Sequence, residues 1–363
     1  MKRMLMVLGA VCSLSVVTAV AFAGKAKPPP APPPPADTGV IYYAFNTGNG
    51  VKQHGMMNTD GTGKTTLPAS TIGSGYFCST PSRVLHGGTR WFLQVREVGG
   101  LDVDGQSVKG ELFAVNQAGT TSIQLTNDAD VLPSHAGTNG FNESSRWAGL
   151  NDEKVSYLGY KLVRTPPFGL LPTEWGIWTA NVTWGTDGVP SATPSTLIPN
   201  GQIPAPTRNS APGYQQYLHY TWAPDGSELM YENLNGSGMW RVGADGSNLT
   251  QIFDGANPRG GRPYDWSSTG RIAYSPISSA GAWYYGIMAM NRDGSAVTQV
   301  VPPPPTGRDL GEARWSPAGT HLVYYDHNNT NSSQDVRRIA ANGTGDVNLT
   351  ADVSGFASPT GWR

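Results

Sequence analysis

A pattern of strand, tight turn and alternating strand recurs along this chain and constrains its fold more than any other feature. The clearest copies are YTWAPDGSELMYE from Tyr220, YDWSSTGRIAYSP from Tyr264 and ARWSPAGTHLVYY from Ala313. In each copy an aromatic residue ends one strand, a turn rich in Pro, Asp, Ser and Gly follows, and apolar residues then alternate. Glycine supplies positive φ in such a turn, and tryptophan can be buried between neighbouring sheets. The residues in question are Gly226, Gly270 and Gly319, with Trp222, Trp266 and Trp315.

A second pattern, an alternating strand followed by a glycine turn and a short strand, comes after each copy of the first. It is clear in MWRVGADGSNLTQI, IMAMNRDGSAVTQV and RRIAANGTGDVNLT, and weaker in HGMMNTDGTGKTTL, ELFAVNQAGTTSIQL and IWTANVTWGTDGVPSATPSTL. The turns are at Gly61, Gly119, Gly188, Gly246, Gly294 and Gly343. The recurrence predicts six structural repeats.

The two ends of the chain complement each other. The first pattern occurs upstream from Arg83, with Val84 in the tryptophan position, and from Arg146, but the first repeat begins at Val40 without it. The segment SPTGW, ending at Trp362, supplies the missing strand at the other end of the chain. We therefore expect an all-β fold over residues 39–363, a six-bladed β-propeller of four-stranded antiparallel blades. The C-terminal strand would join the first blade, which closes the ring and removes free sheet edges.

The hairpins MNRDGS from Met290 and MNTDG from Met57, combined with the tryptophan strand and the SPDG-like turn, resemble the repeat of the TolB-like family of β-propellers, which is WD40-like. The resemblance extends over residues 39–363 and implies the propeller fold. Such a repeat says little about activity. TolB has a separate N-terminal domain, whereas a proline-rich segment precedes the repeats here, so the resemblance does not imply TolB's role in the Tol-Pal envelope system.

The N-terminal residues predict export. Residues 1–23 combine a basic start, an apolar run and Ala21-Phe22-Ala23 before Gly24, which is typical of a signal peptide. Residues 24–38 are proline-rich and predict an extended linker. We expect a secreted or periplasmic protein that is not embedded in a membrane. Removal of Cys12 with the signal peptide would leave Cys78 as the remaining thiol, which excludes an intrachain disulfide.

Several kinds of chemistry find no support in the sequence. The formal net charge is −1 and no basic stripe is present, so we expect no nucleic-acid partner. Neither a Gly-x-Ser-x-Gly segment nor a His-Glu-x-x-His segment occurs, and we predict no metal and no cofactor. His321 and His327 would lie at opposite ends of one strand, which disfavours a metal site with Asp326. The aspartates before the turn glycines are interpreted as turn formers rather than calcium ligands. They are Asp60, Asp187, Asp245 and Asp293.

One candidate site follows from the repeat. The residues that precede the tryptophan position occupy equivalent places on the inner strands and would approach the central channel as a net positive ring that suits a carboxylate or phosphate. They are Arg83, Arg146, Thr221, Asp265, Arg314 and Gly361. In the alternative, carboxylates neutralise the arginines or the side chains point between blades. His219, beside an inner strand, is a further candidate. The predicted ligand-binding residues are Arg83, Arg146, Asp265, Arg314 and His219, and no catalytic residue is assigned.

The sequence favours a monomeric, non-enzymatic binding scaffold for a protein, peptide or envelope polymer. The alternative is a polysaccharide lyase or glycosidase with its site at the channel mouth. An enzyme should bring two carboxylates or a histidine-rich cluster together there, whereas a binding module should present a broad loop face without perturbed titratable groups. Proline-rich loops at residues 165–175, 198–217 and 301–307 are candidates for that face.

Overall fold

The computed structural model describes residues 38–46, 52–68, 81–97, 110–127, 131–133, 145–165, 169–198, 219–232, 238–254, 261–276 and 286–363. The chain divides into residues 1–35 and residues 36–363. The predicted signal peptide, nearly all of the predicted linker, and Cys78 lie outside the described residues. The regular elements of the described residues are all β-strands. No helix among them is long and apolar enough to cross a membrane.

Two sheets in the second half of the chain are simple antiparallel meanders of four strands. In each sheet the first repeated pattern forms the first hairpin and the second pattern forms the last hairpin, as predicted. One contains β13 (Tyr220–Trp222), β14 (Glu228–Glu232), β15 (Gly238–Gly243) and β16 (Thr250–Asp254). The other contains β17 (Gly261–Trp266), β18 (Arg271–Pro276), β19 (Ile287–Asn291) and β20 (Thr298–Val301).

The two ends of the repeat region meet in one sheet. β25 (Phe356–Trp362) pairs antiparallel with β1 (Val40–Asn46), from Trp362 opposite Ile41 to Phe356 opposite Asn46. The last strand of the chain therefore lies against the first, as the sequence predicts. β2 (Lys52–Asn58) and β3 (Thr65–Thr66) continue this group. A parallel bridge between Gln334 and Phe356 joins it to a second group. That group contains β21 (Arg308–Trp315), β22 (His321–Asn328), β23 (Ser333–Ala340) and β24 (Val347–Asn348).

The remaining strands form a three-stranded and a six-stranded sheet. The three-stranded sheet contains β4 (Trp91–Glu97), β5 (Gly110–Asn116) and β6 (Ser122–Gln124). The other contains β7 (Val131–Pro133), β8 (Ser145–Ala148), β9 (Lys154–Thr165), β10 (Gly169–Trp184), β11 (Pro190–Ala192) and β12 (Thr196–Leu197). The segment at 165–175, predicted as a loop, mostly extends the β9–β10 hairpin, because Leu170 to Thr173 pair with Arg164 to Lys161.

The segment around Val84, predicted as a first strand, forms none. The N–H groups of Arg83 and Val84 donate instead to the carboxylate of Asp152, at 2.9 and 3.1 Å. Asp152 lies between β8 and β9 of the six-stranded sheet. A side chain from another sheet thus takes the hydrogen bonds that a paired strand would use. The backbone N–H groups of this segment are therefore satisfied by a side chain of another sheet rather than by pairing with a neighbouring strand.

The nine turn glycines predicted from the two repeated patterns all have positive φ. Gly188 shows why one of them must be glycine. Its φ is 76° and an added Cβ would collide with the backbone of Gly87. Two tight turns from different sheets therefore touch through their main chains, and a side chain at Gly188 would separate them.

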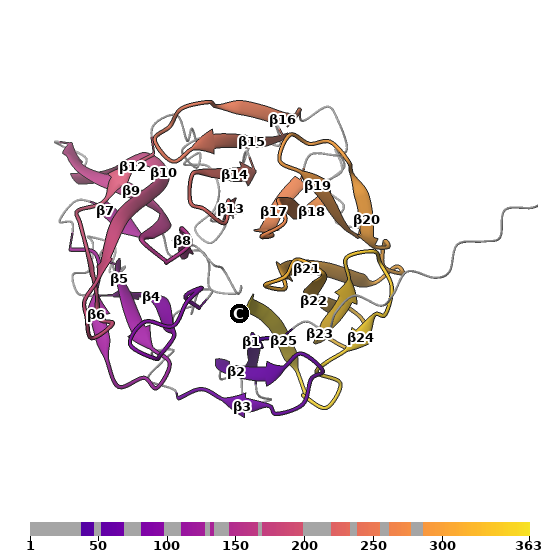
Figure 1. The fold of residues 1–363 in the computed structure, drawn as a ribbon. Helices are drawn as coiled ribbons and strands as arrows, with labels where there is room; N and C mark the ends of the chain where they lie inside the picture. The colour runs from indigo at the N-terminus through magenta and orange to yellow at the C-terminus, as the bar shows by residue number, and fades with distance from the viewer. Residues whose placement is uncertain are drawn as a thin grey trace, which may run out of the picture. The chain divides into compact units, whose positions relative to one another are not determined.

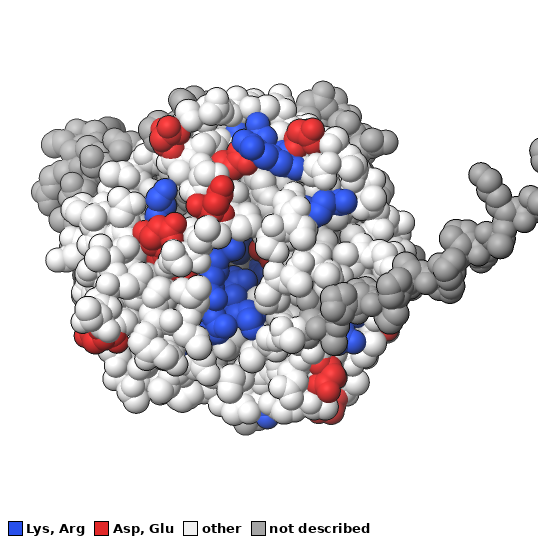
Figure 2. Space-filling model, viewed as in Figure 1, with Lys and Arg blue, Asp and Glu red and all other residues white. Residues whose placement is uncertain are grey.

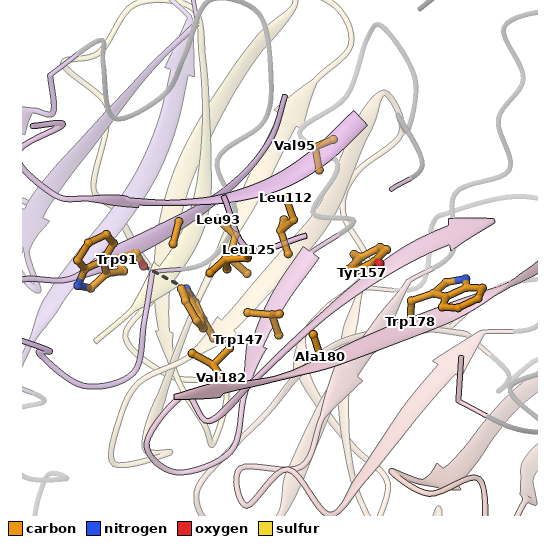
Figure 3. Close-up of a cluster of buried hydrophobic side chains, with 12 residues drawn as sticks. Trp91, Leu93, Val95, Leu112, Leu125, Trp147, Tyr157, Trp178, Ala180 and Val182 are labelled. Atoms are coloured by element: carbon orange, nitrogen blue, oxygen red, sulfur yellow. Dashed lines mark hydrogen bonds between the residues drawn. The ribbon is translucent and has the colours of Figure 1, made fainter. Parts of the chain in front are cut away.

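The predicted burial of tryptophan between sheets is confirmed. Trp147 is 4% exposed and belongs to an apolar cluster with Trp91 and Leu112 of β4 and β5 and with Ala180 of β10 (Figure 3). Val155 of β9 belongs to the same cluster. Its indole N–H donates to the Trp91 carbonyl at 3.1 Å. Three further tryptophans lie in apolar clusters drawn from two sheets: Trp222, Trp266 and Trp315. Trp362 lies in a cluster drawn from both groups of strands in the largest sheet. The core is thus a series of layers between sheets.

The sheets follow one another around a common centre in the order of the chain, with β8, β13, β17, β21 and β25 on the inside (Figure 1). Contacts between β13 and β17, between β17 and β21, and between β21 and β25 support this order. The result is a propeller-like arrangement of antiparallel sheets, and the chain ends at the centre (Figure 1).

Candidate functional site

Irregularities in the inner strands shape the centre. The pairing register shifts between Pro263 and Asp265 in β17 and between Gly311 and Arg314 in β21. Glu312, inside the second shift, has a φ of 51°. Positive φ at a non-glycine residue stores strain, and bulges of this kind turn side chains toward functional sites. Here the bulge brings the Glu312 carboxylate to 3.2 Å from the Arg314 guanidinium.

Two of the predicted site residues, Asp265 and Arg314, connect neighbouring sheets. Arg314 is 1% exposed and donates from Nη1 to the carbonyls of Ala313 and Tyr264, at 2.8 and 3.3 Å. Asp265 accepts the backbone N–H of Trp315 at 2.8 Å. Both side chains therefore stabilise the contact between the inner strands β17 and β21.

The predicted residues Arg146 and His219 also come together. Arg146 is buried, with its guanidinium carbon 5.6 Å from the centroid of the Tyr220 ring. Burial holds the pKa of His219 well below its usual range, and the positive charges of Arg262, Arg146 and Arg314 lower it further. The structure thus gathers arginines from β8, β17 and β21 around an imidazole that is neutral at neutral pH.

A carboxylate that the sequence analysis missed completes this group. Glu232 is 5% exposed, accepts the backbone N–H of His219 at 3.2 Å and lies 3.3 Å from Nε of Arg262. Burial raises the pKa of Glu232 to about 7, against the opposing effect of Arg262 and the His219 hydrogen bond. Burial also raises the pKa of Tyr264 to about 12. The centre therefore contains titratable groups with perturbed pKa values, a feature more typical of an enzyme than of a binding module.

A second cationic group surrounds the C-terminal residue. Burial, together with the positive charges of Arg83 and Arg90, lowers the pKa of Arg363 to about 10, while Asp265 and Asp152 act in the opposite direction. Nε of Arg363 donates to the Pro81 carbonyl at 3.2 Å. The predicted residue Arg83 thus lies in this group, in electrostatic contact with a residue that was not predicted.

Asp152 is the fully buried acid of this second group. Besides the two backbone N–H groups already described, it lies 3.3 Å from Nε2 of His86, whose ring stacks on Trp184 at 3.4 Å. Burial raises the pKa of Asp152, although these backbone donors and the charges of Arg363 and Arg83 favour the carboxylate. Burial thus disfavours the charged form of this carboxyl, while its hydrogen bonds and the nearby arginines favour it.

Together the two groups form a central cluster that carries more positive than negative side chains. Figure 2 shows Lys and Arg atoms gathered at the centre of the visible face, where Figure 1 places the chain end. The arginines of the cluster are Arg83, Arg90, Arg146, Arg262, Arg314 and Arg363. Its acids are Asp152, Asp265, Glu232 and Glu312.

The repeat could have identified part of what was missed. Glu312, like the predicted residue His219, lies three residues before a tryptophan, and the equivalent position in β17 is occupied by Pro263. Arg363 directly follows the last tryptophan. A comparison of every inner-strand position would have found these residues. Asp152 carries no such signal, because it belongs to a turn.

The metal and turn predictions concern other parts of the molecule. Among the residues that the structure describes, no three His, Cys, Asp or Glu side chains gather as metal ligands would. The turn interpretation of the aspartates is confirmed, since each accepts the N–H of the residue two positions later. The bonds are those of Asp60 with Thr62, Asp187 with Val189, Asp245 with Ser247 and Asp293 with Ser295.

Comparison with known proteins supports the fold and leaves the activity open. No family model matches the sequence, and no curated protein sequence matches it. A chain of a nidogen/laminin complex is similar in structure, with 10% identity, a TM-score of 0.50, and coverage of 89% of this chain and 97% of that one. A protein from Agrobacterium tumefaciens assigned to TolB has 15% identity, a TM-score of 0.47, and coverage of 86% and 88%. An oligogalacturonate lyase from Vibrio parahaemolyticus has 11% identity, a TM-score of 0.43, and coverage of 86% and 73%.

Proposed function

We propose that this chain is an exported β-propeller of six blades that acts as a scaffold and binds an anionic group of a protein, peptide or envelope polymer at its centre. Export rests on the signal-like residues 1–23. The six-bladed, closed ring is supported by the pairing of β25 with β1. It is also supported by the largest sheet, in which one parallel bridge is the pairing that joins two groups of four strands.

The excess of positive charge in the central cluster carries this proposal. Arg363 is buried near Arg83 and Arg90, and its pKa is lowered by burial and by both like charges. The negative charges of Asp152 and Asp265 do not fully offset the effect of burial and of these two arginines on Arg363. A bound anion beside Arg363 would supply the missing negative charge. Planar guanidinium groups suit carboxylate, sulfate and phosphate oxygens because they offer parallel N–H donors.

Binding of acidic and neutral polymers tests the proposal. We expect poly-L-glutamate or polygalacturonate to bind and dextran not to bind, with affinity that falls as salt is added. Arg363→Gln should weaken binding about tenfold or more, since a hydrogen bond to a charged group is worth about 1.5–3 kcal/mol. Arg292→Gln is the matched control, because Arg292 is 61% exposed and pairs with Glu228 outside the cluster. Equal loss in the two variants, or equal binding of dextran, would contradict the proposal.

A polysaccharide lyase or glycosidase is the second candidate. The observation that favours it is the group of Glu232, His219 and Tyr264 beside Arg262, with pKa values shifted by burial. A neutral imidazole can accept a proton while a guanidinium neutralises a substrate carboxylate. Release of unsaturated or reducing sugar ends from acidic polysaccharides, abolished in His219→Gln, would favour this candidate over the binding scaffold.

A further inference from the structure

Glu232 is a buried carboxyl group that can take up a proton and that lies beside an arginine of the central cluster. Glu232 is the last residue of β14, and its two oxygens have different partners: the backbone N–H of His219 at 3.2 Å and Nε of Arg262 at 3.3 Å. Arg262 is also the arginine with the largest electrostatic effect on His219, ahead of Arg146 and Arg314. The guanidinium of Arg262 thus pairs with the carboxylate of Glu232 and also belongs to the central cluster, where the ligand is proposed to bind.

The surroundings of Glu232 leave few other groups that could respond in its place. The strand of Glu232 also carries Glu228, which is paired with Arg241 and Arg292. On the neighbouring strand β15, the uncharged Met239 lies opposite Glu232. The charged and titratable groups that β17, β21 and β22 contribute around Glu232 and Tyr264 are Arg262, Tyr264, Asp309, Glu312, Arg314 and Tyr325. Of the two carboxylates among them, Glu312 pairs with Arg314, and Asp309 accepts a hydrogen bond from Asn329. Arginine stays charged throughout the neutral range, and burial raises the pKa of both tyrosines further above it.

We propose that an oxyanion enters the central cluster together with one proton, and that the carboxylate of Glu232 accepts this proton. In the free protein Arg262 pairs with ionised Glu232. On binding, a proton from solvent neutralises Glu232, the pairing with Arg262 is released, and Arg262 pairs with the oxyanion. For a singly charged oxyanion such as acetate the total charge is unchanged, because one negative charge and one proton enter together; a doubly charged oxyanion such as sulfate adds one net negative charge. The inference rests on the proposed function and adds its regulation by pH.

The energetics of Glu232 and His219 fit this exchange. Because burial raises the pKa of Glu232 to about 7, protonation costs little near neutral pH. An added negative charge nearby raises the proton affinity of the same carboxyl further, and by linkage protonation strengthens anion binding by an equal factor. His219 is unsuited to the role, because burial and three arginines hold its pKa well below the usual range.

The expected pH dependence follows from the fraction of Glu232 that is protonated. If the protonated form binds, the apparent dissociation constant is divided by that fraction. With a pKa of about 7, affinity should rise about tenfold between pH 8 and pH 6. About half a proton should enter with each anion at pH 7, where the group is half protonated before binding.

Calorimetric titration with sodium sulfate and sodium acetate tests this inference, because neither anion titrates between pH 6 and pH 8. Measurements in Bis-Tris and Tris, two cationic buffers with different ionisation enthalpies, give the number of protons taken up. Glu232→Gln mimics the protonated carboxyl and should bind at all pH values as the wild type does at pH 6, without proton uptake. Glu228→Gln is the control on the same strand, since that glutamate also pairs with arginine, and it should keep the wild-type pH dependence.

The outcomes separate the inference from the function on which it rests. Saturable binding by the wild type without proton uptake, or uptake that persists in Glu232→Gln, overturns the linkage and leaves the binding function standing. Absence of binding by either anion at every pH overturns both. The wild-type proton count decides the linkage even if Glu232→Gln does not fold. Binding of sulfate but not acetate, with proton uptake, supports the inference and assigns the site to tetrahedral oxyanions.

Discussion

The pairing of the two chain ends predicts that the C-terminal residues after Ala357 hold the whole repeat region together. Truncation after Ala357 removes Trp362, which is 0% exposed and packs with Ile41 of β1 and Val323 of β22. Loss of a buried tryptophan costs about 3–5 kcal/mol. Four register pairs between β1 and β25 disappear as well, and each hydrogen bond contributes about 0.5–1.5 kcal/mol. The total of roughly 5–10 kcal/mol is comparable to the stability of an ordinary domain, about 5–15 kcal/mol.

Urea unfolding followed by tryptophan fluorescence and by circular dichroism measures this effect. We expect the truncated protein to lose its transition or to unfold at a much lower urea concentration, with both probes changing together, because neighbouring sheets share their apolar layers. Val347→Ala is the control, since Val347 is 41% exposed and should change stability by only about 0.5 kcal/mol. A truncated protein with the same midpoint as the full chain would show that β25 does not join the first and last parts of the repeat region.

Three further predictions concern single residues. Trp362→Ala alone should cost about 3–5 kcal/mol in the same urea assay, and a loss below that of Val347→Ala would contradict the role assigned to this ring. Gly188→Ala should destabilise the protein more than Gly345→Ala, because both glycines have positive φ but an added Cβ meets neighbouring backbone only at Gly188; equal midpoints would show that the two turns can separate freely. Glu232→Gln should stabilise the protein at pH 8 and have little effect near pH 4. The folded pKa of about 7 lies above the ordinary value of 4.5, so the wild type loses stability, by about 3 kcal/mol, as pH rises through this interval. Parallel stability profiles of variant and wild type between pH 4 and pH 8 would refute that assignment.

Local patterns in the sequence determined the strands, the turns and the main features of packing. Glycine in a hairpin turn and tryptophan at a strand end act within a few residues, so their recurrence was sufficient to predict both the positive φ at Gly226 and the burial of Trp222. The pairing of the chain ends was also predicted, because a strand missing at one end and present at the other is visible in the order of the repeats. The prediction was wrong around Val84, where backbone N–H groups turn to Asp152 instead of a strand.

The central site was decided by tertiary structure. The sequence brought Arg146, Arg314 and His219 into one candidate set, but Arg262, Glu232 and Arg363 join them because strands of different sheets meet at the centre. The bulge at Glu312 and the buried turn at Asp152 depend on how neighbouring sheets pack against each other. A local sequence pattern does not predict that packing. Charges that lie far apart along the chain shift one another's pKa values only after burial has removed the water between them. The sequence therefore determined the scaffold, whereas the electrostatics of the site arose from the packing of the sheets.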